Sequence, residues 1–505
     1  MSYTEFRASS LLTALVAASL LFSFGCNSSE PPLNEVEEPD ADVDTGVDTG
    51  EDTALPDTST NTDTESPYEC IHSEDCDDGQ VCIDATCVSN ECGEPSTPPG
   101  TSVSIDGYLP EDRATYECEP EHDLVGDQQR TCLDDGSWSG NPPGCIPFKP
   151  PQTQTLFTYP SPGEVDDSIE DHVISLLDSA PAGSKIRASF YSFSRVRVAN
   201  AFVDAHNRGA DVEVIVNNHN VHPDGSYYAG VGVLDEELGG GLTVCNEDAE
   251  PQEAGCVSPR INHNKFILFS ELQGGSDHVV MQTSANMNNP QRAEANSLVT
   301  VHGDEGLYDA YLNHWNDQKG QQIDPDYYHY VEGDYDTKVY FFPRQDGDTI
   351  VEILDEVSCD DQSRIHVNMA FFSDARTAIA ERLADLDAEG CAIHVLVADR
   401  VDFESPGDAV VDALSTGNID FAYFPHDAFD AESGMMIHSK YFLIDAPFGA
   451  NQIRQQLVFT GSHNFNVSSL ERNDEALLRI RDSSTHADFV VDWETLRPHA
   501  TTLHP

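Results

Sequence analysis

The stretch that decides the fold reads His263-Asn264-Lys265-Phe266-Ile267-Leu268-Phe269-Ser270, and it returns as His438-Ser439-Lys440-Tyr441-Phe442-Leu443-Ile444-Asp445. Each copy has a histidine, one spacer, a lysine and an apolar run that is typical of a strand. Because side chains two residues apart lie on the same face of a strand, each histidine is predicted to lie beside its lysine. The chain has only six lysines, so the repeat indicates a function. A histidine next to a fixed cation suits reaction at a phosphate ester, which needs a nucleophile and charge neutralisation.

A second short motif follows each copy. It reads Thr283-Ser284-Ala285-Asn286 after the first and Gly461-Ser462-His463-Asn464 after the second. Hydroxyl and amide groups that follow a strand can donate hydrogen bonds to phosphoryl oxygens. We therefore expect four of these residues to bind the substrate phosphate: Ser284, Asn286, Ser462 and Asn464. His463 fills the variable position of its motif and is interpreted as structural.

The repeat extends beyond these motifs. Residues 187–192 match residues 368–373 with an offset of 181, and each segment precedes a predicted helix, a glycine and a predicted strand. The helices are expected over 199–208 and 378–389, and the strands over 212–216 and 392–397. A strand, helix, strand order given twice predicts an α/β fold of two similar halves packed face to face. Trp315 and Trp493 lie in the expected closing helices and are interpreted as core residues.

These motifs resemble the phospholipase D superfamily, whose signature is HxKxxxxD followed by GSxN, given twice. The resemblance covers residues 155–505, as a first half (155–330) and a second half (331–505). It implies two phospholipase D-type α/β halves on a pseudo-twofold axis that share one site with no metal and no cofactor. The second copy matches fully, whereas the first has Ser270 in place of Asp and Thr283 in place of Gly.

Residue roles follow from this resemblance. One histidine attacks phosphorus and the other protonates the leaving alcohol and then activates water, and His263 is the expected nucleophile and His438 the expected general acid. Lys265 and Lys440 would neutralise the phosphate. Asp445 is assigned either a catalytic support role or a strand-end role. Glu475 could position a histidine, and its counterpart is sought around Glu294 and Asn296.

The amino-terminal part indicates export. Residues 1–25 have one arginine before an apolar run and resemble a bacterial lipoprotein signal that ends before a lipidated Cys26, with a plain signal peptide or an anchor as alternatives. Residues 26–66 form an acidic linker that lacks Lys and Arg and is predicted to be disordered. We expect a lipoprotein of the bacterial outer membrane or cell surface, or a secreted protein.

Twelve cysteines remain after Cys26, an even number that suits disulfides in an oxidising compartment. Residues 67–90 form a small cysteine-rich module. Two local groups in the catalytic part pair Cys245 with Cys256 and Cys359 with Cys391. Their spacing does not fit a zinc site.

Residues 91–146 resemble a sushi (complement control) module, a small disulfide-rich β fold. The matching residues are Cys92-Gly93, Tyr116-Glu117-Cys118, Cys132, Gly136-Ser137-Trp138 and Pro142-Pro143-Gly144-Cys145. The resemblance implies disulfides that join Cys92 to Cys132 and Cys118 to Cys145, with Trp138 as the core residue beside them. It identifies no ligand for this module, for which a passive stalk is the alternative.

The net charge of −65 repels polyanions and disfavours nucleic acid as a substrate. The combined features predict a monomeric phosphodiesterase that hydrolyses phospholipids to phosphatidic acid and a head-group alcohol through a phosphohistidine. The membrane would be reached through the lipid anchor. Three alternatives remain: an extracellular endonuclease, a cardiolipin-synthase-like transferase and a non-catalytic surface adhesion protein.

Overall fold

The computed structural model describes residues 76, 80–83, 86–118, 122–147, 152–247, 254–400, 404–424 and 436–502. The expected signal, Cys26 and the acidic linker lie outside the described residues. By its contacts the chain divides into two units, Met1–Asp77 with Cys82–Val88, and Asp78–Val81 with Ser89–Pro505. In the first unit a disulfide joins Cys76 to Cys87. The short strands β1 (Gln80–Ile83) and β2 (Thr86–Ser89) belong to this cysteine-rich region.

The sushi-like module is a small β structure with two disulfides. Its strands are β3 (Thr101–Ile105), β4 (Arg113–Cys118), β5 (His122–Val125), β6 (Gln129–Thr131) and β7 (Gly144–Pro147). Disulfides join Cys92 to Cys132 and Cys118 to Cys145. Trp138 forms a β-bridge with Cys132 but is only half-buried, contrary to its expected core role. Tyr116 and Arg130 are buried residues at the centre of the module. The guanidinium of Arg130 donates hydrogen bonds to the Tyr116 hydroxyl and to the Trp138 carbonyl.

The first α/β half is a seven-stranded sheet covered on one face by helices. The strand order is β11-β10-β9-β13-β14-β16-β8, and the helices are α1 (Ser168–Ser179), α2 (Val196–Asn207) and α3 (Ala229–Glu237). Helix α2 buries residues at helical spacing, so one stripe packs against the sheet. The strands are β8 (Gln152–Phe157), β9 (Lys185–Phe190), β10 (Asp211–Val216), β11 (Leu242–Val244), β13 (Lys265–Leu272), β14 (Ser276–Thr283) and β16 (Ser297–His302).

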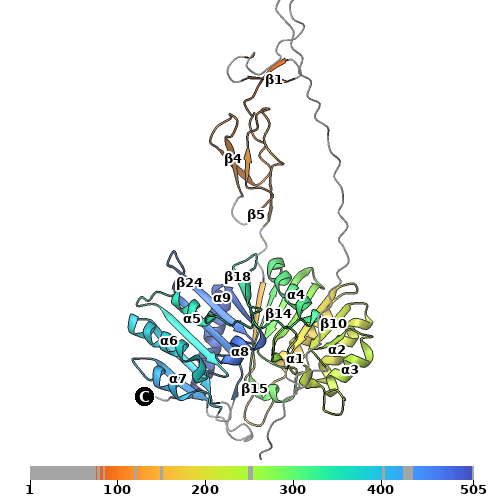
Figure 1. Ribbon diagram of the computed structural model, residues 1–505, viewed down its shortest axis with the longest axis vertical. Helices are drawn as coiled ribbons and strands as arrows, with labels where there is room; N and C mark the ends of the chain where they lie inside the picture. The colour runs from red at the N-terminus through yellow and green to blue at the C-terminus, as the bar shows by residue number, and fades with distance from the viewer. Residues whose placement is uncertain are drawn as a thin grey trace, which may run out of the picture. The chain divides into compact units, whose positions relative to one another are not determined.

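The second half repeats this order of strands and their directions. Its core order is β21-β20-β19-β23-β24-β25-β18, extended at the edges by β17 (His329–Glu332) and β26 (Thr501–Thr502). Helices α5 (Thr349–Asp355), α6 (Thr377–Glu389) and α7 (Asp408–Leu414) cover its outer face (Figure 1). The strands are β18 (Thr337–Phe342), β19 (Arg364–Met369), β20 (Ala392–Ala398), β21 (Asp420–Phe424), β23 (Lys440–Phe448), β24 (Ile453–Gly461) and β25 (Asn473–Arg481).

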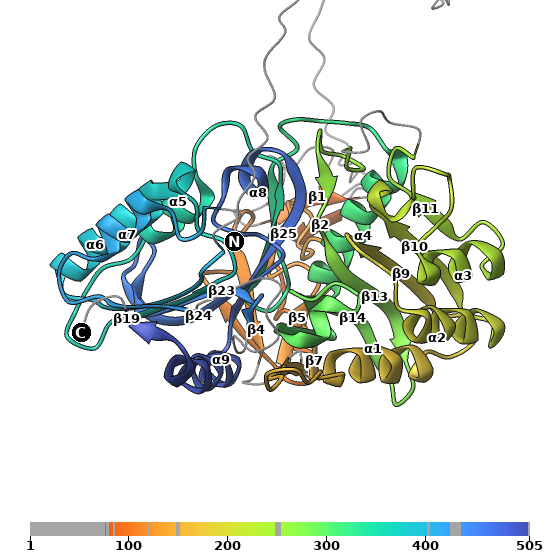
Figure 2. The same ribbon diagram turned by 90° about the horizontal axis from the view of Figure 1, so that it is seen from below.

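A shared apolar cluster joins the two sheets. It includes helices α4 (Glu305–Gly320) and α9 (Ser483–Leu496), and the outer helices of the two halves lie on opposite sides of it (Figure 2). The buried indole of Trp315 donates a hydrogen bond to the Ala188 carbonyl at 3.0 Å, and that of Trp493 donates to the Val367 carbonyl at 3.2 Å. Both tryptophans are therefore core residues that tie a closing helix to a central strand.

The strand register corrects the offset between the halves. Phe190 lies opposite Lys265, whereas Met369 lies opposite Lys440, so equivalent residues are 179 apart rather than 181. The similar residues at Phe190 and Phe371 had suggested an alignment that is shifted by two positions. Because a shift of two residues keeps the same face of the strand, the predicted fold was right although the residues had been paired wrongly.

Candidate active site

Each histidine is held by the backbone of the other half. The short strand β12 (Ile261–Asn262) pairs with β25, and β15 (Glu294–Ala295) pairs with β22 (Met436–Ile437). Next to these ladders, the His263 amide donates to the Asp474 carbonyl at 2.9 Å and the His438 amide donates to the Ala295 carbonyl at 2.8 Å. The two motifs therefore meet because each one extends a strand of the opposite half.

The imidazole rings are also oriented across the interface. His263 Nδ1 lies 2.9 Å from the Glu475 carboxylate, and His438 Nδ1 lies 3.1 Å from Asn296 Oδ1. Since an ionised carboxylate only accepts hydrogen bonds, His263 carries its proton on Nδ1 and keeps Nε2 for a substrate. Glu475 is thus the positioning residue for His263, and the region of Glu294 and Asn296 supplies its counterpart.

The counterpart of Glu475 is an amide. The Ser284 hydroxyl accepts from the Ser297 amide, and the Ser462 hydroxyl accepts from the Ala476 amide. Asn296 precedes Ser297 as Glu475 precedes Ala476, so these two residues occupy equivalent places. The nearest carboxylate to His438 is Glu294, at 3.9 Å from Nδ1. The site therefore pairs one histidine with a carboxylate and the other with an amide.

Both lysines are buried and point back to the histidines. Lys265 Nζ donates to the His263 carbonyl at 2.5 Å, and Lys440 Nζ donates to the His438 carbonyl at 2.5 Å. This contact explains the single spacer between the histidine and the lysine in each motif. Burial, opposed by Glu475, lowers the pKa of Lys265 to about 7. Burial, Lys265 and Arg400 lower the pKa of Lys440 well below its usual value.

The histidines share one electrostatic environment. Burial lowers the pKa of His263 to about 4, with Glu475 opposing this and both lysines adding to it. Burial, Lys440 and Arg400 lower the pKa of His438 well below its usual value, and Lys265 contributes from the other half. Burial raises the pKa of Glu475, but His263 outweighs it and brings the value to about 2. The two pairs therefore act on each other as parts of one site.

The serines have a different place from the one expected. Ser284 and Ser462 are buried, and their hydroxyls are engaged by the backbone of the neighbouring strand. Ser284 Oγ also donates to Asn296 Oδ1 at 2.9 Å. Because these groups are already used, the contacts favour positioning over phosphate binding. Asn464 differs, since its buried Oδ1 has no hydrogen-bond partner among the described residues.

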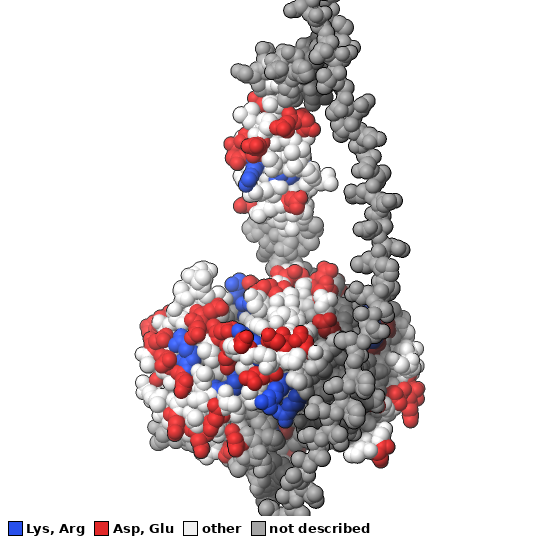
Figure 3. Space-filling model, viewed as in Figure 1, with Lys and Arg blue, Asp and Glu red and all other residues white. Residues whose placement is uncertain are grey.

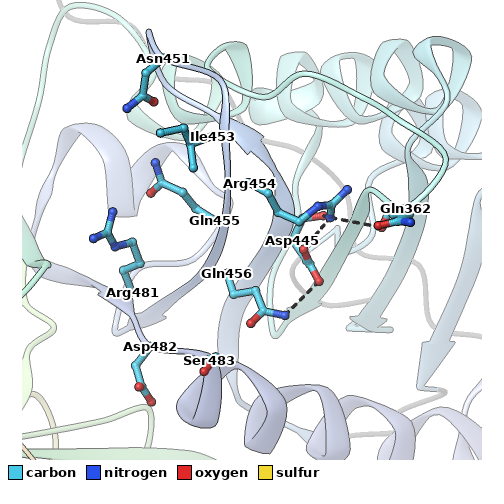
Figure 4. A pocket seen from close by; sticks show the side chains of 10 residues that line it. All are labelled: Gln362, Asp445, Asn451, Ile453, Arg454, Gln455, Gln456, Arg481, Asp482 and Ser483. Carbon is cyan, nitrogen blue, oxygen red and sulfur yellow. Dashed lines mark hydrogen bonds and ion pairs between the residues drawn. The ribbon is translucent and has the colours of Figure 1, made fainter.

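Asp445 does not join the histidines. It lies five residues along β23 from Lys440, about 16 Å at roughly 3.3 Å per residue. Its carboxylate accepts from Arg454 at 2.6 Å and Gln456 at 3.1 Å, in a pocket of about 680 Å³ (Figure 4). Its contacts therefore correct the catalytic assignment. The strand-end alternative is not met either, because β23 continues to Phe448, so the role of Asp445 is an ion pair within the sheet.

Ser270 makes a comparable structural contact in the first half. Its hydroxyl accepts from the Lys185 amide at 2.8 Å and so joins β13 to β9. A serine at this place keeps the strand end attached without a carboxylate. The departure from the motif at Ser270 is therefore compatible with an intact site.

Four residues near the site lie outside the two motifs. Tyr191 stacks on His219 with ring centroids 4.2 Å apart, and the Lys265 ammonium lies 5.4 Å from the Tyr191 ring centroid. In the second half, the Arg400 guanidinium lies 4.7 Å from the Phe371 ring centroid. These residues follow strand ends, and only the strand register reveals that they face the motifs.

One group among the described residues has metal-like geometry, and it consists of Cys245, Cys256 and Asp474. A disulfide joins Cys245 to Cys256, so neither sulfur is a thiolate ligand. Asp474 accepts from the Cys256 amide at 2.9 Å instead. A second disulfide joins Cys359 to Cys391. This group is therefore interpreted as a structural junction.

Comparison with known proteins identifies the family. The family model described as "Cardiolipin synthase, PLD-like domain" matches residues 173–316 and 359–496, more than half of the chain. The chain belongs to this phospholipase D-like family. A sushi repeat model matches residues 92–145. The sushi repeat and the disulfides indicate an extracellular or surface protein. Within the described part of the chain, no helix has the length and apolar character to cross a membrane.

Curated relatives match a small part of the chain. Complement factor B of Bos taurus is 35% identical over 107 residues, which cover 21% of this chain and 12% of that protein. Sushi repeat-containing protein SRPX2 of Homo sapiens is 40% identical over 53 residues, 10% of this chain and 11% of that protein. The chain thus spans about a tenth of the length of these two relatives.

Solved structures are similar to the catalytic part. Phosphatidylserine synthase of Haemophilus influenzae has a TM-score of 0.48 and 13% identity, covering 69% of this chain and 87% of that one. Polyphosphate kinase of Porphyromonas gingivalis has a TM-score of 0.45 and 12% identity, covering 68% and 50%. Nuc, a phospholipase D family member of Salmonella typhimurium, has a TM-score of 0.25 and 21% identity, covering 34% and 95%.

The lowered pKa of Lys265 predicts pH-dependent anion binding. A lysine with a pKa of about 7 keeps its charge below that pH and loses it above, so the affinity for sulfate should fall as the pH rises from about 6 to 9. Sulfate keeps its own charge over this range, and calorimetry measures the affinity. Lys265→Met should flatten the dependence. An affinity in the native protein that does not change with pH would contradict this prediction.

Proposed function

We propose that this protein is a phosphodiesterase of the phospholipase D type that cleaves phospholipids to phosphatidic acid and a head-group alcohol. The observation that carries the proposal is the meeting of two His-Lys pairs, each held by the opposite half. Two buried lysines and two histidines that are oriented through Nδ1 suit one phosphodiester anion. The family membership supports the same class of reaction.

In the first step His263 acts as the nucleophile. Its Nε2 forms a bond to phosphorus while the bond from phosphorus to the head-group oxygen breaks, and His438 gives its proton to that oxygen. The phosphohistidine ring is cationic, so the carboxylate of Glu475 at 2.9 Å stabilises it. His438 lacks such a close carboxylate, which favours His263 for the covalent role. Binding of the phosphate anion favours the protonated form of His438.

In the second step water releases the product. His438 accepts a proton from the water molecule, whose oxygen forms a bond to phosphorus as the bond to His263 breaks. This restores neutral His263 and protonated His438 and yields phosphatidic acid. Lys265 and Lys440 neutralise the charge on the phosphoryl oxygens in both steps.

The charge of the surface favours a lipid over nucleic acid. Acidic side chains are spread across the visible face of the catalytic domain, with few basic groups among them (Figure 3). A nuclease without sequence preference uses a basic track along the phosphate backbone. The acidic surface opposes such a track, whereas a single phospholipid head group needs only the buried lysines.

The substrate class is tested with phospholipid vesicles and plasmid DNA offered side by side to the purified full chain. We expect release of head groups without nicking, and we expect it to persist in EDTA because lysines supply the positive charge. Added ethanol should yield phosphatidylethanol by intercepting the phosphohistidine. Nicking without head-group release would replace the proposal by an endonuclease, and loss of both activities would favour an adhesion protein.

The roles of the histidines are tested by substitution. His263→Ala and His438→Ala should each lower kcat about a hundredfold to ten-thousandfold. With a phosphodiester that has a good leaving group, His438→Ala should accumulate phosphohistidine, because water is no longer activated. Peptide mapping should place the label on His263. His278→Ala, near the start of β14, is the matched control and should keep full activity. A label that is absent from His263 would refute the assigned order.

We also propose that the mature protein is anchored through a lipid on Cys26. The acidic linker of about forty residues would give a root-mean-square reach of about 30–40 Å or more from the membrane. Cys26→Ser should release the protein in soluble form, as measured by fractionation of membranes and by mass spectrometry of the amino terminus. A native protein that is already soluble and carries no acyl group would replace the anchor by simple secretion.

A further inference from the structure

A third cation lies beside the two lysines. Arg400 follows β20, and its side chain is only 11% exposed. Its charge lowers the pKa of both His438 and Lys440, so it lies close to the second His-Lys pair. The mechanism above assigns it no task, because Lys265 and Lys440 already neutralise the reacting phosphate.

Among the described residues, Arg400 donates one long hydrogen bond through its side chain. Its Nη2 donates to the Ile437 carbonyl at 3.5 Å and lies 3.8 Å from Glu294 Oε1, which is beyond hydrogen-bond distance. Its Nε is buried without a hydrogen-bond partner among the described residues. A guanidinium has five N–H donors in a planar fork that matches a carboxylate or a phosphate. A buried arginine whose N–H groups make few hydrogen bonds is suited to bind an anionic ligand.

Glu294 is a weak partner for this cation. Burial raises the pKa of Glu294 to about 7 although Arg400 and Lys440 oppose the rise. Glu294 therefore does not fully neutralise Arg400, and Arg400 and Lys440 repel each other across the site. A second negative charge on the substrate would neutralise Arg400 and reduce its repulsion of Lys440.

The first half has no such cation at the equivalent place. Val216 and Val397 are equivalent by register, and His219 and Arg400 each follow them by three residues. Burial, then Lys265, lowers the pKa of His219 to about 4, so it is neutral and stacks on Tyr191. The additional positive charge is therefore confined to the side of His438.

We propose that Arg400 binds a second anionic group on the head group of the substrate, either a carboxylate or a phosphate. This rests on the proposed function, in which His438 protonates the leaving alcohol and the head group consequently lies on the side of Arg400. The substrate class is then a phospholipid whose head group carries its own negative charge. Phe371, under the guanidinium, would keep the planar fork in place.

Two pairs of soluble probes test the proposal by calorimetry on the full chain. Phosphoserine differs from phosphoethanolamine by one carboxylate, and glycerol bisphosphate differs from glycerol phosphate by one phosphate. We expect the more anionic member of at least one pair to bind about tenfold to a hundredfold more tightly, as charged hydrogen bonds of this kind imply. The pair that discriminates identifies the second anion as a carboxylate or as a phosphate.

Arg400→Gln should remove this discrimination and leave the weaker probes bound within about twofold. Arg364→Gln, an exposed arginine at the start of β19, removes the same charge and should change nothing. If the glutamine variant fails to fold by circular dichroism, Arg400→Lys keeps the charge and should retain only part of the discrimination. Equal affinities within both pairs in the native protein would overturn the proposal, as would an equal loss for all four probes in Arg400→Gln.

Lipid hydrolysis separates this proposal from the proposed function. Vesicles with matched amounts of phosphatidylethanolamine and phosphatidylserine should show preferred release of serine by the native protein and no preference in Arg400→Gln, if the second anion is a carboxylate. If the second anion is a phosphate, the native protein should instead prefer cardiolipin over phosphatidylethanolamine, and Arg400→Gln should lose this preference. If the soluble probes discriminate but no lipid is cleaved, the proposed function fails and the anion site at Arg400 stands.

Discussion

The exchange of short strands between the two halves is the constraint on which the site depends. Two residues of β12 pair with β25 and two residues of β15 pair with β22, and each ladder ends at a histidine. The same segments carry Glu475 and Asn296, which orient the imidazole of the opposite motif. Neither half contains a complete site, because each supplies a histidine and the group that positions the other one. The apolar cluster around α4 and α9 holds the sheets so that these ladders can form.

Burial makes this site dependent on an anion. Lys265, Lys440 and Arg400 are removed from water, and their mutual repulsion is only partly offset by Glu475 and Glu294. Each lysine donates to the carbonyl of the histidine two residues earlier, which fixes its ammonium and leaves other N–H groups for a ligand. A phosphodiester would supply the missing negative charge without a large rearrangement. The cations that lower the pKa of Lys440 would therefore favour binding of an anionic substrate.

The sequence allowed prediction of the fold, the repeat and the His-Lys pairs because these depend on local pattern and composition. It failed where a role depends on what lies opposite in the folded chain. Asp445 has the motif position but lies five residues along β23 from Lys440, where its carboxylate pairs with Arg454. Ser284 has a suitable hydroxyl but uses it on Asn296 and Ser297. Arg400 could not be found by motif, because only the pairing of β10 with β9 and of β20 with β19 shows that it is equivalent to His219.

The residues at which the two halves differ would set the orientation of the substrate in the site. A symmetric site would bind a phosphodiester equally well in either direction, since the two lysines and the two histidines are equivalent. Glu475 gives His263 a carboxylate where His438 has the amide of Asn296, which favours positive charge on one ring over the other. On the side of His438, the guanidinium of Arg400 lies over Phe371, whereas on the side of His263 the neutral ring of His219 stacks on Tyr191. Both asymmetries act in the same direction in the proposed reaction, in which the covalent bond would form at His263 and the charged head group would depart past His438. The direction of the reaction would then come from the few residues at which the two repeats differ.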